Sequence, residues 1–334
     1  MIRPYDDERA GSVLDRLARD IGEVTTPRVL VSQEALAPTT PEEAEPLLEL
    51  LADFEVHLVV TARDLARQLP SAWQQRVQAR HTYTFDEFLR AVVAREELAD
   101  DLWINQDLGQ VLANWSSRIP PERIHVVTAP QIGSEGSLLD RYCSVVGVDP
   151  AALETEAGKG NRSLGYPQAE LLRRVNVALG DRFPSSREGY GRLGKVYLAG
   201  RILQRQQAGS LRLPTEYAEW CGTVAEAWIQ QIREAGFDLV GQESDLRPSP
   251  ESFAAAPDLD EGTLLDVASA ALADVLEVRH EELEERAALR ARNREQAARI
   301  AELERELGAP TAGRRARGPL RGLRRGRPAA GDPG

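Results

Sequence analysis

Short apolar runs alternate with amphipathic stretches along most of this chain. Val56 to Thr61 and Arg123 to Thr128 are mostly apolar and rich in β-branched residues, which is typical of buried strands in a parallel sheet. Arg28 to Ser32 has the same character in its central Val-Leu-Val and predicts another strand. Helical periodicity separates the three runs. The order strand, helix, strand predicts parallel crossover connections.

Helices are predicted wherever apolar residues recur every three or four positions. The predicted helices comprise residues 11–21, 41–54, a segment opening at residue 65, 72–80, a segment opening at residue 84, 101–115, 138–146, a segment opening at residue 167, 195–206 and 215–235. Thr84 and Glu87 have the spacing of a capping box, and Gly236 is a typical helix C-cap. Trp220 and Trp228, on the last of these helices, are interpreted as packing residues.

The C-terminal part of the chain has a different character. From Leu264 to Leu307 the sequence predicts one long charged helix. Arg279, Arg286 and Asn293 stand where a continuous heptad needs apolar residues, which argues against a full coiled coil. Residues 309–334 hold seven arginines among Gly, Pro and Ala. Such a segment can bury almost nothing, so we predict a disordered tail, which either remains a solvated terminus or binds an acidic partner, RNA or an acidic membrane.

Composition narrows the class of protein. The net charge of −12 argues against a nucleic-acid binder, sequence-specific or general. Cys143 and Cys221 are too few for a disulfide framework, and a reducing cytoplasm is the simplest compartment. The four histidines are scattered, so no metal site is expected. The N-terminus lacks the apolar core of a signal peptide, and no run of about 18 apolar residues predicts a membrane span.

A candidate anion site follows the Val56 to Thr61 strand. Arg63 lies just past its C-terminal end, and Asp64 can cap the helix that follows. Pro70 is expected to interrupt that helix, so that Ser71 would stand at the start of a second helical run. Ligands bind at the carboxyl ends of strands in open α/β sheets, helix N-termini favour phosphates, and arginine can hold a phosphate through two parallel hydrogen bonds. The alternative is a surface arginine and a helix-cap serine.

A longer likeness supports the anion site. The run Ala-Arg-Asp-Leu-Ala-Arg-Gln-Leu-Pro-Ser-Ala-Trp-Gln holds Arg63 and Ser71 eight positions apart. Together with Asn-Arg-Ser-Leu-Gly at residues 161–165, it resembles bacterial sulfotransferases of actinobacterial type. The resemblance implies an α/β fold of the P-loop type, with a three-layer arrangement of a parallel sheet flanked by helices, and the cofactor PAPS (3′-phosphoadenosine-5′-phosphosulfate). It further implies that Arg63 and Ser71 hold the 3′-phosphate and that Asn161 and Ser163 approach the cofactor or the acceptor.

The same resemblance implies a catalytic base. Glu34 lies just after the Arg28 to Ser32 strand, where glutamate-using members of the family place the residue that takes the acceptor proton. A carboxylate within hydrogen-bond reach of the acceptor suffices, with its pKa raised by partial burial. The alternative for Glu34 is a solvated loop glutamate, and for Asn161 and Ser163 it is ordinary turn chemistry. His57, at the start of a strand, is interpreted as structural.

One family motif is missing from the sequence. Sulfotransferases begin with a strand that runs into a Pro-Lys-Thr/Ser-Gly-Thr-Thr type loop, whose lysine stabilises the charge that develops on the leaving group. Residues 1–30 contain no lysine, and the phosphate-loop pattern at Gly189 to Lys195 lacks a preceding strand and has Val196 in place of Ser or Thr. We interpret that segment as a flexible loop before a helix. We therefore expect an N-terminally truncated family member whose sheet lacks an interior strand, leaving unpaired edges, and whose sulfuryl transfer is slow.

The domain organisation and the functional hypotheses follow. The resemblance predicts an α/β domain over residues 1–250, a charged helical extension over 251–308 and the disordered tail over 309–334. The first hypothesis is sulfuryl transfer from PAPS to a hydroxyl or amine of a small-molecule, glycan or lipid acceptor, impaired without the missing loop. The second is a non-catalytic scaffold that binds partners through the C-terminal helix and the basic tail. The third, another nucleotide-binding α/β enzyme, has no intact phosphate loop to support it.

Overall fold

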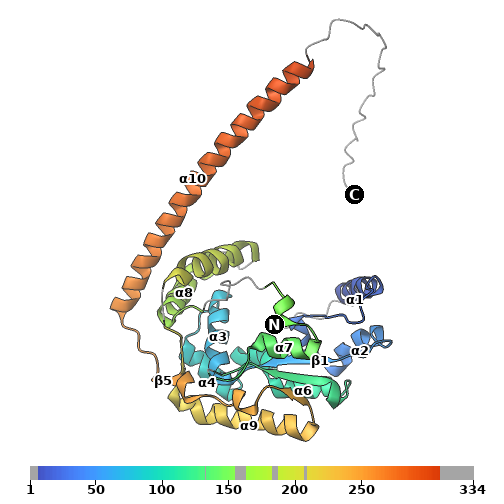
Figure 1. The fold of residues 1–334 in the computed structure, drawn as a ribbon. Coiled ribbons are helices and arrows are strands. Elements are labelled where there is room, and N and C mark those ends of the chain that lie inside the picture. The colour runs from blue at the N-terminus through green and yellow to red at the C-terminus, as the bar shows by residue number, and fades with distance from the viewer. Residues whose placement is uncertain (1–6, 132, 155–162, 183–186, 207–208, 309–334) are drawn as a thin grey trace, which may run out of the picture. The chain divides into compact units, whose positions relative to one another are not determined.

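The chain divides into two compact units, Met1–Leu272 and Ala273–Gly334. Its structure is a computed structural model that describes residues 7–131, 133–154, 163–182, 187–206 and 209–308. Figure 1 follows the elements along the chain. The first unit contains both sheets and almost all of the buried apolar side chains, so the candidate site is sought there.

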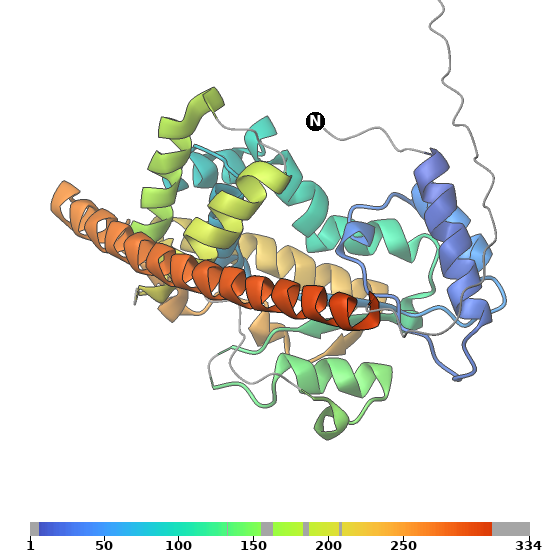
Figure 2. The ribbon, with the colours of Figure 1, turned by 90° about the horizontal axis from the view of Figure 1, so that it is seen from above.

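Two small parallel sheets lie among the helices, which confirms a mixed α/β fold with parallel strand pairing. The strands are β1 (Leu58–Ala62), β2 (Ile124–Thr128), β3 (Leu213–Pro214), β4 (Asp238–Val240) and β5 (Phe253–Ala254). The α-helices are α1 (Asp7–Gly22), α2 (Pro41–Leu50), α3 (Leu65–Gln78), α4 (Phe85–Ala94), α5 (Asp100–Gln106), α6 (Leu108–Ser116), α7 (Leu138–Val146), α8 (Tyr166–Leu179), α9 (Ala218–Ala235) and α10 (Glu261–Gly308). The larger sheet has the order β1-β2-β4, and Figures 1 and 2 draw α7 and α9 on opposite sides of it.

Strands β1 and β2 pair directly along their whole length. The pairing runs from Leu58 beside Ile124 to Ala62 beside Thr128, and β4 pairs with the three central residues of β2. The expectation of unpaired edges around a missing interior strand is therefore wrong for these two strands. Because all three strands are parallel, their carboxyl ends meet at one edge of the sheet.

Residues 28–32 form no strand, and this prediction is wrong. The three central side chains are between 42% and 59% exposed. The segment is instead attached to the end of α7, where Arg28 donates a hydrogen bond of 3.0 Å to the Val146 carbonyl. A β-branched apolar sequence fits a pleated surface, but the propensity alone cannot supply a neighbouring strand to pair with.

Aromatic and aliphatic side chains of α3, α4 and α6 form the centre of the core. Trp73, Phe88 and Leu112 are fully buried. The indole N–H of Trp73 donates to the Tyr83 carbonyl at 3.2 Å, and its ring lies 5.2 Å from that of Phe85. The buried indole thus keeps a hydrogen-bond partner. This packing holds α3, the helix that directly follows β1, against the core.

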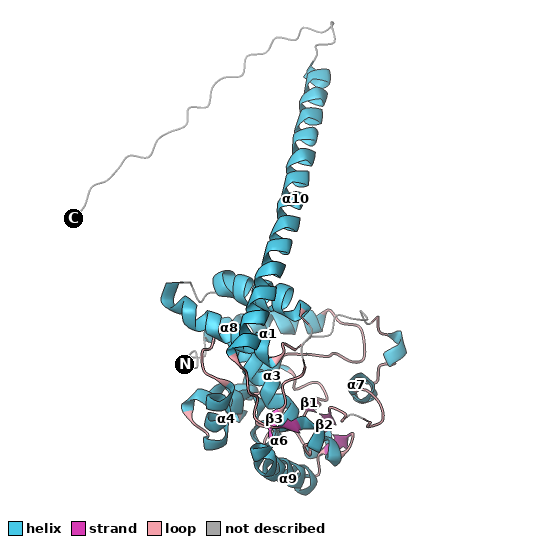
Figure 3. Cartoon of the chain, turned by 90° about the vertical axis from the view of Figure 1, so that its left-hand side faces the viewer, coloured by secondary structure: helices cyan, strands magenta, loops and turns pink. Residues whose placement is uncertain are grey.

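Helix α10 belongs to both units. Leu264 and Ala271 are buried, whereas every described side chain from Leu283 to Arg305 is exposed. Figure 3 shows α10 as one continuous helix, which confirms the long C-terminal helix. The arginine-rich tail at 309–334, for which disorder was predicted, lies outside the described residues.

Candidate functional site

The carboxyl edge of the larger sheet is the candidate site. Arg63 follows β1, Ala129 follows β2 and Gly241 follows β4, so these residues leave the sheet at the same edge. In open sheets of parallel strands, ligands bind at this edge.

Arg63 is the cation that this edge exposes to solvent. Its guanidinium makes no hydrogen bond or ion pair with any residue that the structure describes. Desolvation and then the charge of Arg67 lower the pKa of Arg63, while Asp64 opposes them. An arginine side chain nevertheless stays protonated in proteins. Arg63 can therefore accept an anion without first breaking an internal ion pair.

Behind Arg63, two charged residues join the start of α3 to the end of β2. Asp64 is fully buried and caps α3 by accepting the backbone N–H of Arg67 at 3.0 Å. The Arg67 guanidinium pairs with Asp64 and donates to the carbonyls of Pro130 (2.8 Å) and Ala129 (3.0 Å). The buried carboxylate thus has a cationic partner, as burial of a charge requires. This role of Arg67 was not predicted from the sequence, although an aspartate three residues before an arginine at a helix start was the available signal.

Asp245 is the centre of a second polar cluster at this edge. Five donors reach its fully buried carboxylate: the Thr128 hydroxyl (2.8 Å), the Arg141 guanidinium (2.6 Å), the Ser134 hydroxyl (3.0 Å) and the backbone N–H groups of Gln131 (3.1 Å) and Gln242 (3.1 Å). Burial raises the pKa of Asp245, but these hydrogen bonds outweigh it and hold the pKa below its ordinary value. Gly241 has φ +122°, and a Cβ there would lie 2.0 Å from the Thr128 hydroxyl oxygen, so the cluster requires glycine.

Gln131 connects the two clusters. Its side-chain amide donates to Asp64 at 3.4 Å and to the carbonyls of Asp245 at 3.3 Å and Arg247 at 2.9 Å. Because the buried charges of both clusters have partners inside the protein, we interpret the clusters as supports that fix the sheet edge. Arg63 is the charged group at this edge that is left for a ligand.

Ser71 lies inside α3, and the predicted helix break at Pro70 is wrong. Helix α3 continues through Pro70, and the Ser71 hydroxyl donates to the Arg67 carbonyl at 3.3 Å. Serine in a helix interior commonly makes such a bond to the residue four positions earlier. Proline removes its own N–H from the helix and its ring crowds the carbonyl four residues earlier, and the packing of Pro70 among buried neighbours offsets this cost. No hydrogen bond joins Ser71 to Arg63, so their joint binding of a phosphate stays a prediction.

The segment around Leu164 packs beside α3. Leu164 is buried, and its carbonyl accepts a hydrogen bond of 2.7 Å from the Gln74 side chain, three positions after Ser71 on the helix. Residues three apart are neighbours on a helix surface. Ser163, which is exposed, directly precedes this contact. Asn161 lies outside the residues that the structure describes.

Glu34 begins a short 3-10 helix, η1 (Glu34–Leu36), and is exposed. The partial burial expected of a catalytic base is not found. The helix η1 is attached to α6, because the indole N–H of Trp115 donates to the Leu36 carbonyl at 3.1 Å. The role of Glu34 as a base therefore rests on the resemblance alone.

The glycine pattern at Gly189 to Lys195 lies within a π-helix, η6 (Arg187–Ile202), so its interpretation as a flexible loop is wrong. Gly194 has a packing reason, because a Cβ there would lie 2.3 Å from the Tyr190 ring. Tyr190 is itself buried and donates to the Asn176 side chain of α8 at 2.5 Å. At Gly194 the pattern thus allows close packing of the Tyr190 ring.

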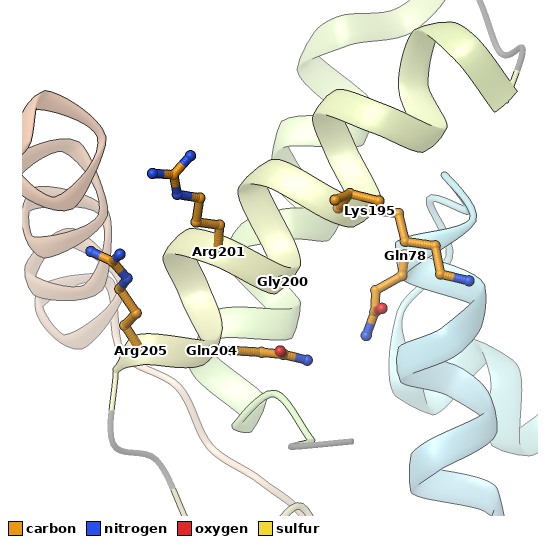
Figure 4. Close-up of a pocket in the computed structure, with 7 residues that line it drawn as sticks. Gln78, Lys195, Gly200, Arg201, Gln204 and Arg205 are labelled. Atoms are coloured by element: carbon orange, nitrogen blue, oxygen red, sulfur yellow. The ribbon is translucent and has the colours of Figure 1, made fainter. Parts of the chain in front are cut away.

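A cavity of about 600 Å³ lies beside η6. Its lining includes Lys195, Arg201 and Arg205. In Figure 4, Gln78 and Gln204 point into the space between α3 and η6, whereas Arg201 and Arg205 extend on the other side of η6. The cations diverge, so they do not form a single phosphate cradle. Because Gln78 is the last residue of α3, the cavity lies at the end of that helix opposite to the sheet edge.

Other classes of site find no support in the described part of the chain. There, no group of three or more His, Cys, Asp or Glu side chains could hold a metal ion, and no helix has the length and apolar character to cross a bilayer. Comparison with protein-family models, with curated proteins and with solved structures finds no match to this chain. The likeness to sulfotransferases therefore rests on the sequence motifs alone.

Proposed function

We propose that this chain is a sulfotransferase-type protein of P-loop architecture that binds a 3′-phosphorylated adenine nucleotide at the carboxyl edge of β1. The observation that carries the proposal is the exposed, unpaired guanidinium of Arg63 at that edge. A phosphate is the ligand that such a group recognises best, because its oxygens match the planar fork of arginine donors.

The proposed reaction is sulfuryl transfer from PAPS. The acceptor oxygen or nitrogen attacks the sulfur, the bond from sulfur to the 5′-phosphate oxygen breaks, and adenosine 3′,5′-bisphosphate leaves. Glu34 is the proposed base for the acceptor proton, and Arg63 with Ser71 the proposed ligands of the 3′-phosphate. Ser163 is a further proposed contact of the nucleotide, supported by the hydrogen bond that ties the next residue, Leu164, to Gln74 of α3. The acceptor would be a small molecule, a glycan or a lipid.

The test is calorimetric titration with adenosine 3′,5′-bisphosphate. We expect the wild-type protein to bind it and Arg63→Ala to bind it at least about tenfold more weakly, because hydrogen bonds to a charged group contribute roughly 1.5–3 kcal/mol. The control is Arg292→Ala, which removes an exposed arginine from α10. Adenosine 5′-monophosphate serves as the ligand control because it lacks the 3′-phosphate.

Two results would contradict the proposal. One is equal affinity of wild type and Arg63→Ala for the bisphosphate. The other is equal affinity of the wild type for the bisphosphate and the 5′-monophosphate. If Arg63 binds the phosphate and Ser71→Ala has no effect, the Ser71 hydroxyl stays on the Arg67 carbonyl and only half of the predicted pair is used.

The exposed part of α10 favours a second candidate function, the non-catalytic scaffold. Leu289, Ile300 and Leu303 are 56%, 56% and 40% exposed on a stretch where every described side chain is exposed. Isolated helices gain little stability in water without packing of an apolar face. A partner that covers these side chains would supply that packing.

Truncation after Glu282 separates the two functions. The cut keeps the buried Leu264, Ala271 and Val278. We therefore expect cooperative unfolding with a melting temperature within about 2 °C of the full chain, and unchanged nucleotide binding. The scaffold function requires that comparative affinity capture loses its partners with the truncated protein. Retention of the same partners would exclude the helix and tail as the binding element.

A further inference from the structure

Four side chains form a hydrogen-bonded chain across the amino ends of the larger sheet. His57 directly precedes β1, His125 lies on β2, Asp238 begins β4, and Glu55 stands two residues before His57. The distances are 2.9 Å from Glu55 Oε1 to His57 Nε2, 2.8 Å from His57 Nδ1 to His125 Nε2, and 2.6 Å from His125 Nδ1 to Asp238 Oδ2. All four imidazole nitrogens therefore have a partner.

The contact between the two rings fits a proton and not a metal ion. The ring planes differ by only 8° and the ring centroids are 5.2 Å apart. With 2.8 Å between the facing nitrogens, the rings meet edge to edge and their lone pairs point at each other. A metal ion needs these directions to converge on a separate point, with further ligands around it. No third ligand is available among the residues described in the structure.

Counting protons defines the state that this geometry requires. Each carboxylate accepts one N–H from its own histidine, which uses two protons, and the bond between the rings uses a third. With only two protons on the four imidazole nitrogens, one of the three contacts has no proton, so a nitrogen lone pair faces a carboxylate or another lone pair. With four, two N–H groups face each other at 2.8 Å. With both carboxylates ionised, only the state with three protons on four nitrogens, a histidine pair with one positive charge, satisfies all three bonds.

The surroundings favour one positive charge on the pair. Glu55 faces His57 and Asp238 faces His125. The guanidinium of Arg123, which directly precedes β2, lies 3.7 Å from the Glu55 carboxylate. The hydrogen bond from His57, and then the charge of Arg123, lower the pKa of Glu55, so this carboxylate stays ionised near neutral pH. Two carboxylates and one arginine surround the pair, so the net charge of these three groups is negative. A negative charge beside the histidines favours an extra proton on them.

We propose that Glu55, His57, His125 and Asp238 form a proton-dependent clasp that joins the amino ends of β1, β2 and β4 while the two histidines share one extra proton. The clasp makes stability pass through a maximum with pH. In acid, the unfolded histidines bind four protons and the native pair three, so stability falls as pH decreases. In base, the unfolded histidines bind two protons and the native pair three, so stability falls as pH increases.

The direct test is nuclear magnetic resonance of the protein labelled with ¹⁵N-histidine. We expect three protons on the four nitrogens of the pair near neutral pH, and two uptake steps separated by about 1 pH unit or more, as for any strongly interacting pair. His81 and His280 are internal controls in the same spectrum. In His57→Gln, His125 should titrate in a single step. One proton on each ring of the wild type, with independent titration, would overturn the proposal.

Stability measurements give an independent readout. Urea unfolding of the wild type between about pH 5 and 9 should follow a bell-shaped pH profile, which brackets the ordinary titration of histidine. His57 is 41% exposed, so His57→Gln can replace it without opening the core, and this variant should lose the bell-shaped component. Glu55→Gln removes a negative charge beside the pair, so it should shift both limbs of the bell-shaped profile to lower pH. His280→Gln should leave the profile unchanged. Identical profiles for wild type and His57→Gln would reject the clasp.

Discussion

At the scale of single residues, one sheet edge holds two kinds of charged group. Asp64, Arg67, Arg141 and Asp245 are paired inside the protein, because an unpaired buried charge is too costly to keep. Arg63 is exposed and has no hydrogen-bond or ion-pair partner among the described residues. The first group supports the edge, and the second is available to a ligand.

The Asp245 cluster makes the sharpest prediction at this scale. Asp245→Asn keeps the size of the side chain but leaves the buried Arg141 without its carboxylate. We expect the free energy of unfolding near neutral pH to fall by about 3 kcal/mol, at the lower end of the range for broken buried ion pairs. Urea denaturation measures it. The control is Asp86→Asn, which breaks an exposed ion pair with Arg90. This substitution should change the free energy of unfolding only a little.

The stability difference between wild type and Asp245→Asn should also depend on pH, with a known sign. The folded pKa of Asp245 lies below its ordinary value. Its contribution is therefore fully present above about pH 4, where an unfolded aspartate is ionised, and is lost as pH falls through the lowered folded value. The free energies of unfolding of the two proteins should therefore become equal in acid. If the difference in free energy of unfolding stays constant throughout the acid range, the charge of Asp245 is not the cause of that difference.

At the scale of elements, the chemistry of a few neighbouring residues decides where helices begin. Thr84 and Glu87 form the predicted capping box, with the Glu87 N–H to the Thr84 hydroxyl at 3.2 Å and the Thr84 N–H to the Glu87 carboxylate at 2.7 Å. Pro70 is the counter-example, because tertiary packing carries α3 through a residue that locally disfavours a helix.

The capping box predicts a measurable cost for losing the Thr84 hydroxyl. Thr84→Ala removes the acceptor for the Glu87 N–H at the start of α4 and should lower the free energy of unfolding by about 1 kcal/mol. Chemical denaturation measures the loss. Thr82→Ala, two residues earlier and exposed, is the control and should leave the value unchanged. Equal effects of the two substitutions would show that the cap contributes nothing specific.

At the scale of the whole molecule, the larger sheet is short and is reinforced at both ends. The longest of its strands have five residues, so the ladder contributes few hydrogen bonds. The His57–His125 chain joins the three strands at their amino ends. The Asp64 and Asp245 clusters join the segments that leave the sheet at the carboxyl ends. Internal hydrogen bonds therefore fix the backbone segments at the candidate ligand edge.

Most of the helices, two strands of the larger sheet and the position of Arg63 at a strand end could be predicted from the sequence. These features follow from periodicity and capping, which act between residues close in the chain. The sequence could not show that the backbone of residues 28–32 pairs with no other strand. A strand forms only where the fold supplies a second strand beside it. Only the tertiary structure could join Arg141 to Asp245, 104 residues apart, and leave Arg63 as the exposed charge. The pairing of buried charges depends on which segments, distant in the sequence, are in contact in the fold. Local sequence patterns carry no information about such contacts.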